Sequence, residues 1–238
     1  MPYYYGFDMT YIVLVLPCIL LALIASANVN STFKRYAKVY SSRKITGADA
    51  AQRVLRNHGV YNVSVERVRG NLTDHFDPKA NVIRLSEAVY DSTSTAAIGV
   101  ACHEAGHAVQ YAQSYFPIRV RAAIIPITNF GSKLAIPLIL LGVLLSAFAD
   151  YSYNLVYVGI ACFALSLVFQ LITLPVEFNA SRRAIVAIEE GEILTEDEIR
   201  GARRVLRAAA LTYVAAAAVS LAQLLRLILI FGGRRSRD

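Results

Sequence analysis

The chain is poor in cysteine, with three among 238 residues, and none is placed for a disulfide framework. Cys18 and Cys162 lie inside long apolar runs. Cys102 precedes His103, and on a helix it would lie about 100° around the axis from that histidine. We therefore expect all three to behave as small hydrophobic residues rather than as metal ligands. A catalytic cysteine is the alternative that residue type alone leaves open.

Internal repeats, low-complexity tracts and nucleic-acid-binding motifs are also missing. The net charge of +7 is therefore not read as a sign of nucleic-acid binding. The basic residues lie beside apolar runs, where attraction to anionic lipid headgroups and control of membrane topology are the simpler explanation. They are Arg119, Arg121, Lys133, Arg182, Arg183 and the segment Arg203–Arg207.

Charged residues make up only 17% of the chain and hydrophobic residues 56%, which is too apolar for an ordinary soluble domain. Four apolar runs account for the excess and predict membrane-spanning helices. They are Thr10–Val29, Leu134–Ala149, Leu155–Val176 and Leu211–Phe231, the last interrupted by Arg226. Whether Leu211–Phe231 crosses the bilayer completely stays open. Prolines and arginines among large apolar residues predict an interfacial segment over Tyr115–Lys133.

No Lys or Arg precedes the first run, whereas a signal peptide begins with a positive segment. We expect an uncleaved anchor, with cleavage near Ala25-Ser26-Ala27 as the alternative. The positive-inside rule then places Lys34–Lys44 and the chain up to residue 120 in the cytoplasm, and Asp150–Asn154 on the far side. The basic tail Arg234–Arg237 would end outside, against this rule, if the fourth run crosses.

Local signals predict the remaining elements. A capping box of Thr46 and Asp49 begins a helix over Gly47–Asn57, and Thr195 with Glu198 begins the helix that becomes the fourth span. The other expected elements are strands at Asn62–Val68 and Asn81–Leu85, a short helix from Ser86 to Tyr90 and a helix from Ser94 to Ser114. Asn81–Leu85 is the candidate edge strand that could pair with an extended substrate; an ordinary small sheet is the alternative.

These elements predict a mainly α-helical, multi-pass membrane protein with a small α+β zincin-like domain. We expect a transmembrane anchor over residues 1–30, and a cytoplasmic zincin-like domain with an interfacial segment over 31–130. Two transmembrane helices follow over 131–176, then cytoplasmic helices over 177–210, and a fourth transmembrane helix with a basic tail over 211–238.

Residues 103–107 read His-Glu-Ala-Gly-His, the pattern H-E-x-x-H of zinc peptidases. On a helix, positions i and i+4 share one face, so His103 and His107 can bind one ion. Glu104 is then placed to take a proton from a zinc-bound water. Random placement of four histidines and nine glutamates gives this string in roughly one chain in four hundred.

A hydrolytic zinc site needs a third protein ligand. His58, His75 and the carboxylates are candidates. Glu177 stands out because it follows Pro175 at the end of the third apolar run, where a separate helix Glu177–Glu190 is expected. From the residues alone, a solvated carboxylate at the membrane exit is the simpler interpretation. His58 is expected to end a helix and to have no role at the site.

The chain resembles the YugP-type membrane zinc metallopeptidases and, more distantly, the HtpX-type peptidases. The resemblance covers about residues 45–210 and rests on four segments: Leu72–Pro78, Val82–Glu87, His103–His107 and Pro175–Ala184. It implies that Glu177 is the third zinc ligand. This chain has Asn179 where the family has Asp, and Ser181 where HtpX-type peptidases carry a supporting Asp, so the residues that support the ligands must differ.

Together these features predict a zinc endopeptidase of the gluzincin type, with one Zn²⁺ per chain held by His103, His107 and Glu177 and with Glu104 as general base. His75, Arg182 and Arg183 are candidates for stabilising the oxyanion, and Ser181 for supporting a ligand. The alternatives are hydrogen bonding of His75 to Asp74 or Asp77, and pairing of the arginines with lipid or with Glu189 and Glu190.

The expected partners are a peptide or protein substrate near the membrane, the lipid bilayer, and further copies or other membrane proteins; nucleic acid is not expected. The site is expected on the cytoplasmic side of the cell membrane. One rival is a non-catalytic membrane scaffold with a structural zinc, closed by His75 as fourth ligand. The other is a zinc amidase that acts on a non-peptide amide.

Overall fold

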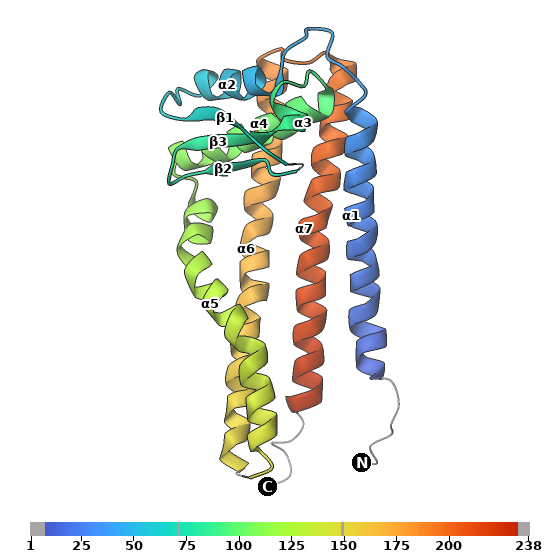
Figure 1. The fold of residues 1–238 in the computed structure, drawn as a ribbon, viewed down its shortest axis with the longest axis vertical. Coiled ribbons are helices and arrows are strands. Elements are labelled where there is room, and N and C mark those ends of the chain that lie inside the picture. Colours follow the sequence, from blue (N-terminus) through green and yellow to red (C-terminus); the bar gives the residue numbers. More distant parts are fainter. Residues whose placement is uncertain (1–7, 71, 149, 233–238) are drawn as a thin grey trace. The chain divides into compact units, whose positions relative to one another are not determined.

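The computed structural model describes residues 8–70, 72–148 and 150–232, and within them the chain is mainly helical (Figure 1). Among the described residues, four helices are long and apolar enough to cross a membrane. They are α1 (Leu16–Tyr36, preceded by the π-helical turn Tyr11–Val15), α5 (Phe116–Leu145), α6 (Asn154–Glu190) and α7 (Glu196–Phe231). A short 3₁₀ turn, Asp150–Tyr153, precedes α6. The predicted fold class is confirmed.

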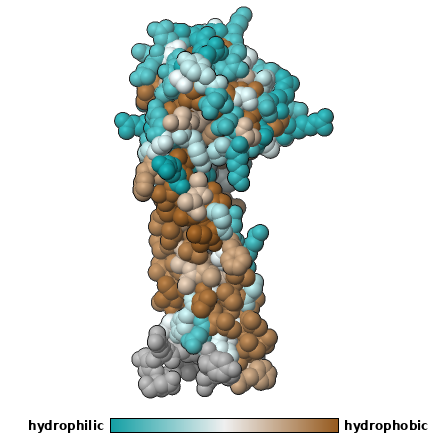
Figure 2. Space-filling view, turned by 90° about the vertical axis from the view of Figure 1, so that its left-hand side faces the viewer, coloured by the Kyte–Doolittle hydropathy of each residue, from teal (hydrophilic) through white to brown (hydrophobic). Residues whose placement is uncertain are grey.

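The chain divides into two compact units. The apolar unit comprises Met1–Ile24, Val120–Thr173 and Tyr213–Asp238, and the α+β unit comprises Ala25–Arg119 and Leu174–Thr212. In the face shown in Figure 2, hydrophobic residues cover most of the surface of the apolar unit, and hydrophilic residues cover most of the α+β unit. Large side chains that are strongly exposed in the apolar unit, such as Phe130, Leu144 and Leu229, suit a lipid environment.

In the α+β unit, the helix α2 (Gly47–Asn57) begins at the predicted capping box. Asp49 N–H donates to Thr46 Oγ1 at 3.1 Å, and Thr46 N–H donates to Asp49 Oδ2 at 3.4 Å. The buried face of α2 packs on α4 (Thr95–Ala112), whose N-cap is Ser94. A helix from Ser94 to Ser114 was predicted. Apolar residues of α2, α4, α6 and α7 form one core, and the motif helix α4 lies within it.

A three-stranded sheet lies against α4 in the order β1–β3–β2 (Figure 1). Its strands are β1 (Ser64–Val68), β2 (His75–Asp77) and β3 (Val82–Ser86), and the short helix α3 (Glu87–Tyr90) follows β3. β3 pairs in parallel with β1 and antiparallel with β2. Asn81–Leu85 was the candidate edge strand for an extended substrate, but β3 is the central strand, paired with β1 along its length and with β2 over its first three residues. The alternative of an ordinary small sheet therefore holds.

Two expected interruptions are absent from the described helices. α5 runs unbroken from Phe116, so most of Tyr115–Lys133 forms the first half of the same long helix as the second predicted span. α6 continues through Pro175 to Glu190, so the predicted separate helix Glu177–Glu190 is wrong. A proline removes one N–H from the helix ladder, and continuing the helix keeps the remaining backbone groups bonded.

Two further local expectations from the sequence are met. Thr195 N–H donates to Glu198 Oε2 at 3.0 Å at the start of α7, as the capping pair predicts. His58 is the C-cap of α2, with Nδ1 2.8 Å from the Val54 carbonyl oxygen. The basic tail Arg234–Arg237 lies outside the described residues.

Within the apolar unit, Arg226 of α7 has an acidic partner. Its guanidinium binds the Asp8 carboxylate, with Nε 2.8 Å from Oδ2, and lies over the Tyr11 ring at 5.4 Å. The Arg226 side chain is 22% exposed. An ion pair and a cation–π contact therefore compensate the charge that interrupts the fourth apolar run.

Replacing Asp8 with asparagine is expected to leave the Arg226 charge uncompensated. We expect a loss of about 2 kcal/mol in the free energy of unfolding, which corresponds to roughly 4 °C in the thermal midpoint of the purified protein. In the double variant Asp8→Asn/Arg226→Gln, much of this loss should be recovered. A midpoint for Asp8→Asn equal to that of the wild type would contradict the role of this ion pair.

Candidate metal centre

Three side chains of the α+β unit converge on one point. His103 and His107 lie one turn apart on α4, and Glu177 faces them from α6. Glu177 Oε2 is 3.4 Å from His103 Nε2 and 3.6 Å from His107 Nε2. The three ligand atoms all lie within 4.8 Å of one another, and no other group of three or more His, Cys, Asp or Glu among the described residues is arranged in this way.

Two imidazole nitrogens and one carboxylate oxygen are a donor set that suits zinc, and three protein ligands leave a coordination position for water. Glu177 is only 3% exposed and His107 8%. Burial alone would lower the pKa of His107, but the carboxylates of Glu177 and Glu104 and the side chain of Gln110 outweigh it and raise that pKa. The same negative field favours a bound cation in place of the proton.

The close approach of α4 to α6 depends on Gly106. A Cβ at this position would lie 2.8 Å from the backbone oxygen of Ala180, closer than real Cβ atoms come. The fourth residue of the motif therefore lets α4 carry both histidines to within reach of Glu177.

Replacing Gly106 with alanine is expected to push the two helices apart. Because the added Cβ would collide with the backbone of Ala180, which cannot rotate away, overpacking should lower the free energy of unfolding by about 1–3 kcal/mol. The displaced histidines should bind zinc tenfold more weakly or worse. Zinc affinity can be measured by competition with a chelating dye. Gly232→Ala is the matched control, since its added Cβ would meet only ordinary contact at 3.7 Å. Wild-type zinc affinity in Gly106→Ala would refute the packing argument.

Each ligand histidine is supported through its second ring nitrogen. Ser181 Oγ lies 3.1 Å from His103 Nδ1, which places the predicted supporting residue against a ligand. Gln110 Oε1 lies 3.0 Å from His107 Nδ1. Sequence reasoning missed Gln110; the available signal was a polar residue three positions after a motif histidine, on a helix rich in Ala and Val. The structure shows that this glutamine is fully buried.

The Gln110 side chain also connects the two helices. Its Nε2 donates to the Val176 carbonyl at 2.9 Å and to Asn179 Oδ1 at 2.9 Å. Asn179 therefore contacts the residue that holds His107. Supporting residues of this kind fix the orientation of metal-binding imidazoles.

Glu104 is held from the sheet. Phe76 N–H of β2 donates to Glu104 Oε2 at 3.0 Å. β2 is positioned in turn by Asp74, which accepts hydrogen bonds from Ser86 N–H at 2.7 Å and Ser86 Oγ at 3.1 Å. Burial, together with the nearby Glu104 charge, raises the pKa of Asp74. The sheet thus orients the carboxylate beside the two histidines.

Other predicted residues lie elsewhere. His75 is on β2, with Nδ1 2.7 Å from the Thr73 carbonyl oxygen and Nε2 3.5 Å from Arg84 Nη1, so the alternative of hydrogen bonds to Asp74 or Asp77 does not hold. His75 does not belong to the metal-binding group. Cys102 is fully buried, and burial raises the pKa of its thiol, as expected for a hydrophobic role.

The two arginines after Ser181 differ in their surroundings. Arg183 donates to Asn179 Oδ1 at 2.7 Å and to Gln113 Oε1 at 2.6 Å. Arg182 lines a groove between α6 and α7. The expected pairing of these arginines with Glu189 is wrong, because Glu189 pairs with Arg203 at 2.6 Å.

Comparison with known proteins agrees with this geometry. Residues 11–232 match the family described as "Putative neutral zinc metallopeptidase". The chain is 48% identical over 230 residues to the "Putative membrane protease YugP" of Bacillus subtilis (strain 168), covering 97% of this chain and 100% of that protein. No solved structure matches significantly. A family match over nearly the whole chain, with the donor set in place, means that the protein belongs to this neutral zinc metallopeptidase family.

Proposed function

We propose that this protein is a membrane-bound zinc endopeptidase that hydrolyses peptide bonds near the cytoplasmic surface of the membrane. The observation that carries the proposal is the convergence of His103, His107 and Glu177 beside Glu104. One zinc ion per chain, when bound, would lower the pKa of a water molecule to about 7 and polarise a substrate carbonyl.

Glu104 is the proposed general base. Its Oε2 accepts the Phe76 N–H, whereas its Oε1 has no hydrogen bond from the part of the chain that the structure describes. Oε1 is therefore free to take a proton from the attacking water and to deliver it to the leaving amine nitrogen. The Phe76 bond keeps the carboxylate from rotating between these two steps.

We propose no oxyanion role for His75. Successive side chains of a strand point to opposite faces of the sheet, and Phe76 packs on Tyr111 of α4, so the His75 ring lies on the other face, beside Arg84. Arg183 is engaged by Asn179 and Gln113.

The non-catalytic scaffold is less well supported because a closed structural site needs four ligands, and the group formed here has three. The cytoplasmic location and a membrane-proximal substrate rest on the positive residues after the first span and on the position of Glu177 in a helix long enough to span a membrane.

The test is proteolysis by the purified full-length protein. Casein and a synthetic membrane-spanning peptide are incubated with the enzyme, with the enzyme after chelator treatment, and with the chelated enzyme resupplied with zinc. We expect cleavage that is lost with the chelator and restored by zinc, with products identified by mass spectrometry. Zinc-restored hydrolysis of a non-peptide amide without cleavage of either peptide substrate would favour the amidase instead.

A further inference from the structure

Four polar side chains join α4 to α6 beside the metal centre, and all of them belong to the α+β unit. They are Gln110 and Gln113 of α4, and Asn179 and Arg183 of α6. We call them the α4–α6 network. Gln110 is fully buried, and Asn179 and Arg183 are partly buried. Polar groups withdrawn from water are stable only when hydrogen-bonded, so the bonds within the network determine how its members are arranged.

The guanidinium group of Arg183 binds two partners at once. Its Nε donates to Asn179 Oδ1 at 2.7 Å, one helical turn away on α6, and its Nη1 donates to Gln113 Oε1 at 2.6 Å, at the C-cap of α4. Its Cζ also lies 5.8 Å from the centre of the Tyr115 ring, a cation–π distance. A planar guanidinium held at two nitrogens has little freedom to rotate. Arg183 therefore fixes the position of Asn179 Oδ1.

The Asn179 oxygen connects Arg183 with Gln110. Besides the Arg183 Nε–H, this oxygen accepts a hydrogen bond from Gln110 Nε2 at 2.9 Å. The same Gln110 nitrogen donates to the Val176 carbonyl oxygen at 2.9 Å, so both of its hydrogens are used. The amide plane of Gln110 is therefore held in one orientation, in which Oε1 lies 3.0 Å from His107 Nδ1.

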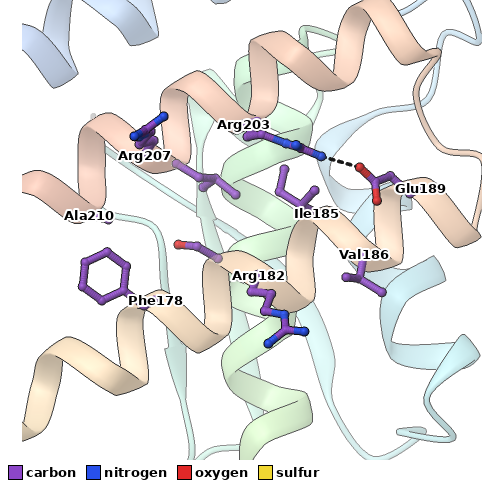
Figure 3. Close-up of a pocket in the computed structure, with 10 residues that line it drawn as sticks. Phe178, Arg182, Ile185, Val186, Glu189, Arg203, Arg207 and Ala210 are labelled. Atoms are coloured by element: carbon purple, nitrogen blue, oxygen red, sulfur yellow. Dashed lines mark hydrogen bonds and ion pairs between the residues drawn. The ribbon is translucent and has the colours of Figure 1, made fainter.

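Two neighbouring arginines have different surroundings. Arg182 precedes Arg183 on α6 and lines a groove of about 470 Å³ between α6 and α7 (Figure 3). Consecutive helix positions lie about 100° apart, so the two arginines face different sides of α6. Arg203 of α7 pairs with Glu189 of α6 at 2.6 Å across the same groove (Figure 3). These arginines offer comparisons in which an equal charge lies away from the α4–α6 network.

We propose that Arg183 is a positioning residue of the metal centre, which acts through Asn179 and Gln110 on the orientation of His107. The inference rests on the proposed zinc function and adds a residue that bonds to Asn179 and Gln113 rather than to a metal ligand. A ring already held in the binding orientation loses less conformational entropy when the metal binds, so the affinity for zinc is higher.

The test measures the zinc affinity of full-length variants in detergent by competition with a chelating dye. Arg183→Met should bind zinc about tenfold more weakly, at the lower end of the range for residues that support a ligand. Asn179→Leu should show a similar loss, whereas Asn179→Asp should keep the wild-type affinity because a carboxylate oxygen accepts the same two bonds. Arg203→Met is the matched control, since it removes an arginine that pairs with Glu189 of α6, and its zinc affinity should equal that of the wild type.

A double-mutant cycle separates positioning from a general effect on stability. If Arg183 acts through Gln110, Arg183→Met should add no further loss of zinc affinity to Gln110→Leu. It should add its full tenfold loss to Ser181→Ala, because Ser181 supports the other histidine. An equal added loss in both backgrounds would overturn the inference, as would wild-type affinity in Arg183→Met.

Two further outcomes are decisive. If Arg183→Met does not fold, Asn179→Leu and Asn179→Asp test the same connection, and equal zinc affinity of these two variants would overturn it. A wild-type chain that binds no zinc would overturn the proposed function and this inference together. Tight zinc binding by the wild type without any loss in Arg183→Met would overturn the inference alone.

Discussion

Replacing Glu104 with glutamine is expected to abolish peptide hydrolysis and to leave one zinc bound per chain. Glu104 does not belong to the group of ligand atoms, so its charge is not needed to hold the metal. An amide cannot accept the proton of the attacking water, and loss of general acid–base catalysis should lower kcat by at least 10²–10⁴-fold. The hydrogen bond from Phe76 N–H can persist to the amide oxygen, so the position of β2 beside residue 104 should be kept.

The measurements are kcat on the casein or peptide substrate and zinc per chain by atomic emission. Glu87→Gln is the control, because Glu87 is an exposed carboxylate at the start of α3 and its neutralisation should change neither value. Full proteolysis by Glu104→Gln would exclude Glu104 as the base. Loss of zinc along with activity would mean that Glu104 helps to hold the metal.

Glu177→Ala is expected to release the zinc. Glu177 supplies the single oxygen donor of the group and comes from a different helix than the histidines, so its removal leaves two nitrogens of α4 alone. Loss of a direct ligand should weaken binding by more than the 10–100-fold that is typical of a supporting residue. After dialysis we expect little zinc in Glu177→Ala.

Ser181→Ala provides the graded comparison for this prediction. Its hydroxyl contacts His103 Nδ1 but does not face the metal, so zinc affinity should fall by about 10–100-fold. Both variants should be checked for folding by circular dichroism. Unchanged zinc content in Glu177→Ala would show that the third ligand is another residue, and an equal effect of the two variants would contradict the distinction between ligand and support.

Local sequence signals predicted much of this molecule. The capping box of Thr46 and Asp49 involves groups only three residues apart, and the shared face of His103 and His107 follows from helix geometry alone. The apolar runs predicted the candidate membrane spans because such spans are identified by the length and composition of the segment alone. Glu177 lies far along the chain from the histidines, and its assignment as a ligand came from the family resemblance.

Features that depend on distant partners could not be predicted in this way. Whether Asn81–Leu85 is an edge strand or a central strand depends on where β1 and β2 pair with it. The sequence of one strand does not determine the order of strands in the sheet. Pro175 signals a helix end locally, but the helix continues because its neighbours keep the backbone bonded. The role of Gln110 requires α6 to lie against α4, and the sequence does not state that contact.

The hydrogen bonds around Gln110 have a consequence for the proton on His107. Arg183 can only donate, so the atom of Asn179 that it meets must be the oxygen. The Val176 carbonyl can only accept, so the Gln110 amide nitrogen must face it, and the Gln110 oxygen is left to face His107 Nδ1. That oxygen needs a hydrogen, so Nδ1 of His107 carries one, and Nε2 is the ring nitrogen that faces Glu177. A permanently charged arginine two side chains away thus decides which nitrogen is available to a metal ion before one arrives.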